Sequence, residues 1–136
     1  MDPVLRLKHH HLTVLTEEAL RVDPVEACGL LFGKKTPATI HVKRVVVSQN
    51  QLDSATRFEI DPENVVAAFS EADKEGLDFV GLFHSHPASA TPSPIDLKSM
   101  KLWGDAVWLI LSSTDGGVAA YQMKNGKVIE IRIRVE

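Results

Sequence analysis

The sequence predicts a mixed α/β fold in which helices flank a central sheet, and three observations support this prediction. First, 136 residues with 44% hydrophobic content and a net charge of −3 suit one packed core rather than a disordered chain. Second, short apolar and β-branched runs, separated by polar or Gly/Pro-rich loops, recur along the chain as strands do. Third, residues 61–76 carry the apolar spacing of an amphipathic helix. Because no repeat or linker interrupts the sequence, we expect residues 1–136 to form a single domain.

The first half of the chain begins with apolar pieces, at 4–5 and 12–15, that fit either a helix or a strand. Residues 16–22 predict a short helix that ends before Pro24. The apolar run 26–33 predicts a buried strand, and the β-branched run 40–47 predicts a second one. After the polar loop 48–56, residues 57–60 predict a third strand.

A clear helix start follows at residue 61. Asp61 suits the N-cap, Pro62 suits the first helical position, and Gly76 suits the end of the helix. Four apolar residues between them recur at helical spacing: Val65, Val66, Phe69 and Ala72.

The second half of the chain predicts a strand at 77–83 that leads directly to His84. Ser93 and Pro94 then begin a helix that extends to about Trp103. Strands are expected at 107–111, 118–123 and 128–135, and Asn125-Gly126 predicts a tight antiparallel turn between the last two.

Composition excludes several classes of function. With 15 basic and 18 acidic residues, no overall positive field attracts the protein to nucleic acid. A single cysteine, Cys28, excludes an internal disulfide framework and a zinc site built from several thiolates. The sequence contains neither the apolar run of a membrane span nor a targeting segment, so we expect a reducing, cytoplasmic location and no membrane partner.

The strongest chemical signal is a cluster of potential metal ligands. His84 and His86 are two residues apart at the end of a predicted strand, so their side chains leave the same face of the sheet. Asp96 falls at the third position of the helix whose N-cap is Ser93, where backbone donors favour its ionised form. Two imidazoles, one carboxylate and a water form an open zinc site of the catalytic type. The sequence lacks the paired cysteines that zinc deaminase chemistry needs.

A metal-dependent hydrolase also needs a general base, and Glu26 is the candidate. It opens an apolar strand, where an acid that faces the core would be tuned by burial towards proton transfer. Ser93 is a candidate donor of a hydrogen bond to a tetrahedral oxyanion.

Each of these residues has an ordinary structural explanation when taken alone. Ser93 and Asp96 are common capping residues, and Glu26 alone would be a surface acid. The functional prediction therefore depends on the whole combination. Other residues have weaker signals: His41 and the run at 9–11 are expected to be merely polar, Cys28 to be a small buried residue, and Trp103 and Trp108 to be core anchors.

The motifs together resemble the JAMM (MPN+) zinc metalloprotease family, including its prokaryotic members. Residues 26–31 (EACGLL) look like the family's glutamate motif, residues 81–87 (GLFHSHP) match its histidine motif, and residues 93–96 (SPID) match its last motif. Residues 57–62 (RFEIDP) also resemble the segment before the central helix of such proteins. The resemblance covers roughly residues 15–121.

The resemblance implies an MPN-like, cytidine-deaminase-like domain and a deubiquitinase-like isopeptidase. Such an enzyme hydrolyses the amide bond after the C-terminal Gly-Gly tail of a ubiquitin-like modifier or sulfur-carrier protein. Carried over to this chain, the resemblance makes His84, His86 and Asp96 the ligands of Zn²⁺, Glu26 the residue that activates water, and Ser93 the oxyanion donor.

One departure from the family pattern is visible between Pro87 and Ser93, where residues 88–92 form a loop one residue shorter than usual. Long insertions seen in relatives that read ubiquitin linkages also have no room here. Two other functions stay open: release of cysteine or another small group from a ubiquitin-fold sulfur carrier, and a non-catalytic MPN scaffold. The expected partner is a ubiquitin-like modifier or its conjugates, and a homodimer is possible.

Overall fold

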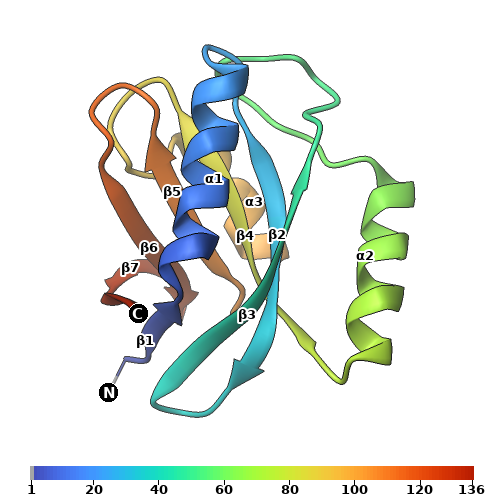
Figure 1. The fold of residues 1–136 in the computed structure, drawn as a ribbon. Coiled ribbons are helices and arrows are strands. Elements are labelled where there is room, and N and C mark those ends of the chain that lie inside the picture. Colours follow the sequence, from blue (N-terminus) through green and yellow to red (C-terminus); the bar gives the residue numbers. More distant parts are fainter. Residues whose placement is uncertain (1) are drawn as a thin grey trace.

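The computed structural model describes residues 2–136, which form a mixed sheet of eight strands and three helices (Figure 1). The strands are β1 (Val4–Leu7), β2 (Cys28–Lys35), β3 (Thr39–Ser48), β4 (Asp78–His86), β5 (Val107–Ser112), β6 (Val118–Lys124), β7 (Lys127–Ile131) and β8 (Ile133–Val135). The helices are α1 (His9–Val22), α2 (Pro62–Lys74) and α3 (Pro94–Leu102). The predicted α/β class is confirmed.

The sheet has the strand order β7-β6-β5-β4-β2-β3-β1-β8. Strand β4 lies near its middle, where it pairs antiparallel with β2 and parallel with β5. Strands β7 and β8 lie at opposite ends of this order, yet only Arg132 separates them along the chain. The sheet must therefore curve until its two edges meet, and the N–H of Leu5 in β1 donates to the Arg132 carbonyl at 2.8 Å.

The curvature creates two hydrophobic clusters, one on each face of the sheet. One contains Leu15 and Ala19 of α1 packed against strands that include β4 and β5. The other contains Ala68 and Ala72 of α2, together with Met100 of α3. Figure 1 accordingly shows α1 in front of the sheet and α3 behind it, with α2 to one side.

Helix α1 is longer than the sequence predicts, since it begins at His9 rather than at residue 16. His11, Leu15 and Ala19 are buried at spacings of four residues, so this face of α1 packs onto the sheet. The Nδ1 atom of His11 accepts the backbone N–H of Lys8 at 3.2 Å, which helps to cap the helix. His11 therefore has a structural role that the sequence analysis missed.

Two strand predictions and one core prediction are wrong. Residues 57–60 form no strand, only an isolated bridge between Asn50 and Ile60. The predicted strand 128–135 is divided into β7 and β8, because the two pieces pair with opposite ends of the sheet. Trp108 is a core residue as expected, whereas Trp103 is 40% exposed. The hairpin at Asn125 is confirmed, with the positive φ of 51° that such a turn requires.

Close strand spacing beside the site depends on Gly81. A Cβ added at Gly81 in β4 would collide with the carbonyl oxygen of Val107 in β5. We expect Gly81→Ala to lower the free energy of unfolding by about 1–3 kcal/mol, since the two strands would have to separate. Urea denaturation measures this change. An unchanged midpoint would mean that β4 and β5 can move apart at little cost.

Within residues 2–136, no helix combines the length and the apolar character that crossing a membrane requires.

Candidate active site

The end of β4 brings two histidine side chains together. His84 and His86 are both buried on one face of the sheet, and their Nε2 atoms are 3.0 Å apart. The Oδ2 atom of Asp96 in α3 lies 3.1 Å from His84 Nε2 and 3.0 Å from His86 Nε2. Three potential ligand atoms from two separate elements thus meet at one point.

The start of α3 places Asp96 in this position. The Ser93 backbone N–H donates to Asp96 Oδ2 at 2.9 Å, and the Asp96 N–H donates to Ser93 Oγ at 3.1 Å. This reciprocal arrangement is a capping box, the ordinary explanation of the two residues. The same bonds also direct the Asp96 carboxylate towards the histidines, so capping and site assembly depend on one set of contacts.

Glu26 approaches the cluster from the segment before β2. Its side chain is 1% exposed, and its Oε2 atom lies 3.7 Å from His86 Nε2. Among the described residues, its other oxygen, Oε1, has no hydrogen-bond partner. Burial is the main reason that the pKa of Glu26 is raised to about 8. This carboxyl group therefore faces the core, the case in which burial tunes an acid towards proton transfer.

The three clustered residues shift one another's protonation. Burial lowers the pKa of His84. Burial acts in the same direction on His86, but the hydrogen bond to Asp96 and the charges of Asp96 and Glu26 together outweigh it and raise the pKa of His86. Burial opposes ionisation of Asp96, yet the hydrogen bonds from both histidines, the His84 charge and the Ser93 N–H together outweigh it, so the pKa of Asp96 lies well below its usual range. Asp96 is therefore ionised, which is the form that binds a cation.

The cluster has the dimensions of a metal site. Zinc bonds of 2.0–2.1 Å to nitrogen and oxygen imply ligand atoms about 3.3 Å apart at the corners of a tetrahedron. The three separations of 3.0, 3.0 and 3.1 Å are close to this value. Glu26, His84 and His86 also offer ligand atoms that all lie within 4.8 Å of one another. These residues therefore fit a metal ion, with four side chains available around it.

Aromatic side chains enclose His84. The ring of Phe58 stacks on the His84 imidazole, with centroids 4.8 Å apart and an interplanar angle of 22°. Trp108 meets the same imidazole edge-on at 5.5 Å. A site role for Phe58 was not predicted from the sequence, although the match of residues 57–62 to the family pattern is a usable signal.

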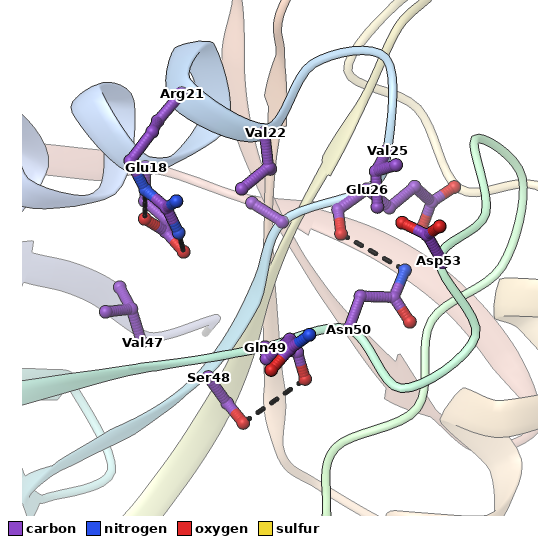
Figure 2. A pocket seen from close by; sticks show the side chains of 11 residues that line it. Glu18, Arg21, Val22, Val25, Glu26, Val47, Ser48, Gln49, Asn50 and Asp53 are labelled. Atoms are coloured by element: carbon purple, nitrogen blue, oxygen red, sulfur yellow. Dashed lines mark hydrogen bonds and ion pairs between the residues drawn. The ribbon is translucent and has the colours of Figure 1, made fainter.

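A cavity of about 640 Å³ adjoins Glu26 from the side of α1 (Figure 2). Its walls include Arg21 of α1, Val47 of β3 and Asn50 beyond β3. His84, His86 and Asp96 do not line it. Of the four clustered residues, the cavity therefore adjoins Glu26 alone.

Other candidate residues lie outside the cluster. Cys28 pairs with His84 across the sheet, but its thiol is buried, donates to the Ser48 carbonyl at 3.5 Å and has a pKa raised by burial to about 12. It is the small buried residue that the sequence predicts. His41 lies in β3 beside Arg6 of β1, away from the cluster.

The buried Glu26 predicts a pH-dependent stability in protein prepared without metal. Because the folded-state pKa is about 8 and the ordinary value is 4.5, the folded state keeps a proton that the unfolded state releases over this range. Stability should thus fall as the pH rises from 5.5 to 8.5, relative to Glu26→Gln. Relative to Glu26→Gln, we expect the free energy of unfolding to fall by on the order of 2 kcal/mol between these pH values. This is less than the whole pKa shift implies, because nearby solvent screens the charge. Urea denaturation of both proteins at both pH values measures it, and parallel pH curves would contradict it.

The fold and the site together define the class of protein: a mixed α/β domain with a buried cluster of histidines and carboxylates that is able to bind a metal ion. The chain belongs to the prokaryotic homologs of the JAB domain, because the model of that family matches residues 8–125. It is a JAMM-type hydrolase, as its motifs predict.

Curated relatives carry names that agree with this class. The chain is 37% identical to a desampylase of Pyrococcus furiosus over 133 residues, which cover 97% of this chain and 91% of the relative. It is 32% identical to a desampylase of Haloferax volcanii, with coverage of 88% and 85%. It is also 32% identical to a probable TtuB-protein conjugate cleaving protease of Thermus thermophilus, with coverage of 82% and 71%.

A solved structure supports the fold. The protein DSY2949 from Desulfitobacterium hafniense has a TM-score of 0.86 and 28% sequence identity to this chain. The match covers 97% of this chain and 92% of DSY2949. The curved sheet with its three helices is therefore shared with a known structure along nearly the whole chain.

Proposed function

We propose that this protein is a zinc-dependent isopeptidase that hydrolyses the amide bond after the C-terminal Gly-Gly tail of a ubiquitin-like modifier. The observation that carries the proposal is the Glu26 carboxylate beside three ligand atoms 3.0–3.1 Å apart, one of its oxygens having no hydrogen-bond partner within residues 2–136. The names of the relatives, desampylase and conjugate cleaving protease, support the substrate class.

His84, His86 and Asp96 would hold the metal. Asp96 Oδ2 is 3.0 Å from His86 Nε2, whereas Glu26 Oε2 is 3.7 Å away, so Asp96 completes the tighter set. Zinc bound there would polarise the carbonyl of the scissile amide and lower the pKa of a coordinated water. This assignment leaves Glu26 free for proton transfer.

Glu26 would act as the general base and then as the general acid. Its carboxylate takes a proton from the attacking water and passes it to the departing amine, so that the products are a free tail carboxylate and a free amine. Burial favours this role, because it brings the pKa of Glu26 to about 8, within range of the working pH.

Ser93 would stabilise the oxyanion. Its Oγ atom accepts the Asp96 N–H at 3.1 Å, which leaves the hydroxyl proton free to donate. Because this hydroxyl is fixed at the helix N-cap, it is held in place before the negative charge develops on the carbonyl oxygen.

The decisive experiment compares two linkages to one modifier. A ubiquitin-fold protein ending in Gly-Gly is joined either to a lysine side chain or, by a peptide bond, to cysteine, and release is followed by mass spectrometry. We expect cleavage of the lysine conjugate and none when the last glycine is replaced by proline. Preferred release of cysteine would support action on a sulfur carrier instead, and no cleavage by zinc-loaded protein would support a scaffold.

Removal of zinc should abolish turnover without unfolding the protein. We expect about one zinc per chain, loss of activity with a strong chelator and recovery when zinc is added back. The circular dichroism spectrum should stay near native, because both hydrophobic clusters consist of apolar side chains and include none of the proposed ligands. Full turnover without metal contradicts the mechanism, and global unfolding would make the site structural.

A cytoplasmic location, a homodimer, the lack of a nucleic-acid partner and the assignment of all of residues 1–136 to one domain stay predictions.

A further inference from the structure

We propose that Asn50 is a positioning residue that sets the Glu26 carboxylate relative to the Phe58–His84 stack. The inference rests on the proposed function, in which Glu26 transfers the proton. Asn50 lies just beyond β3, touches neither the clustered ligands nor the reacting atoms, and is 7% exposed. It acts only through the groups that its amide binds.

The Asn50 side chain forms hydrogen bonds to several backbone groups of the loop at residues 49–60 and to Glu26. The two N–H groups of its amide face three backbone carbonyls, so one N–H is shared, and its oxygen accepts two backbone N–H groups; its hydrogen-bonding capacity is thus fully used. The carbonyls belong to Glu26 (3.1 Å), Arg57 (2.9 Å) and Ser54 (3.4 Å), and the N–H groups to Leu52 (3.0 Å) and Glu59 (3.1 Å).

The backbone of Glu26 is held by this loop. Its N–H donates to the Ser54 carbonyl at 2.7 Å, and its carbonyl accepts from Asn50, as Figure 2 shows. The sheet ladder begins two residues later, at Cys28. The loop therefore supplies both backbone contacts that fix Glu26.

The Glu26 carboxylate has no such support of its own. Among the described residues, Oε1 lacks a hydrogen-bond partner, and Oε2 lies 3.7 Å from His86 Nε2, too far for a hydrogen bond. The position of the carboxylate thus follows from the position of the backbone. A misplacement of about 1 Å at a reacting group can cost about 10²-fold in rate.

The same amide also holds the aromatic wall of the site. Asn50 bonds the carbonyl of Arg57 and the N–H of Glu59, the two residues on either side of Phe58. Phe58 in turn stacks on His84 at 4.8 Å. One side chain therefore links the backbone of Glu26 to the aromatic ring that stacks on His84.

Asn50→Asp tests this role with almost no change in shape. The variant keeps the acceptors for Leu52 and Glu59 but replaces the donor to Glu26 with an oxygen that repels its carbonyl. We expect the single-turnover rate to fall about 10- to 100-fold, the range seen for supporting residues around a site. Zinc content should stay at the wild-type value, and KM should change less than kcat.

A double-mutant cycle separates positioning from a general structural effect. If Asn50 acts through Glu26, adding Asn50→Asp to Glu26→Gln should cause no further loss beyond about twofold, since the group being positioned is already inactive. Gln122→Ala is the control. The Gln122 amide also donates to a backbone carbonyl of a segment distant in sequence, that of Asp105 at 2.8 Å. We expect the wild-type rate from it.

Three results would overturn the inference. They are a wild-type rate for Asn50→Asp, losses that multiply in the double variant, and loss of native circular dichroism in both Asn50→Asp and Asn50→Ala. The last would mean that Asn50 holds the fold rather than the carboxylate. Failure of the proposed function has a different signature: Glu26→Gln alone would then turn over at the wild-type rate.

Discussion

Glu26→Gln should lower the single-turnover rate for a modifier isopeptide by about 10²- to 10⁴-fold, the usual contribution of general acid–base catalysis. Glutamine keeps the size and polarity of the side chain but removes the basic carboxylate. Zinc content should stay at the wild-type level, because His84, His86 and Asp96 already supply three ligand atoms within 3.1 Å of one another. Single-turnover cleavage and metal analysis on the same sample measure both quantities.

Two outcomes would contradict this assignment in different ways. Turnover at the wild-type rate would remove Glu26 from the mechanism. Loss of zinc together with activity would make Glu26 a ligand, which its 3.7 Å separation from His86 Nε2 would allow after a small movement. Glu59→Gln is a matched control, because that acid belongs to the neighbouring loop and contributes its backbone to the contacts there. We expect it to keep the wild-type zinc content.

His86→Ala should remove both zinc and activity. The variant deletes one of the three ligand atoms and also the hydrogen bond that helps to keep Asp96 ionised. Metal-ion catalysis supplies several kcal/mol of transition-state stabilisation, so turnover should fall by at least about 10³-fold. Zinc stoichiometry after dialysis and single-turnover cleavage provide the two measurements.

The matched control is His41→Ala, which removes a histidine of β3 beside Arg6. It should keep one zinc per chain and the wild-type rate. The ligand assignment fails if His86→Ala retains stoichiometric zinc, or if His41→Ala loses it. A stable fold is expected for both variants, since the hydrophobic clusters contain neither histidine.

Predictions from the sequence succeeded where the signal was local. The start of α2 at Asp61-Pro62 and the turn at Asn125 depend on the backbone preferences of a few adjacent residues, and the structure has both. Asp96 lies at the third position of α3 because the Ser93 cap and the spacing of three residues determine it. The pairing of His84 and His86 on one face follows from the alternation along a strand.

Predictions failed where distant segments decide the structure. The start of α1 at His9 depends on burial of His11 against the sheet, which outweighs the modest helix propensity of the histidine run. The division of residues 128–135 into β7 and β8 requires the sheet to close on itself, and no local pattern encodes that contact. Trp103 is the C-cap of α3 and is 40% exposed, a position that the apolar character of its side chain does not predict.

The chemistry of this protein can be predicted from the order of its residues: which side chains are able to bind a metal, and the family to which the chain belongs. Only the packing of the whole sheet places Glu26 at 3.7 Å from His86, through the antiparallel pairing of β2 with β4. The same packing lets the Asn50 side chain bond the backbone of the loop at residues 49–60. Contacts of this kind join segments that are far apart along the chain, so they arise only when the whole sheet and its loops pack together.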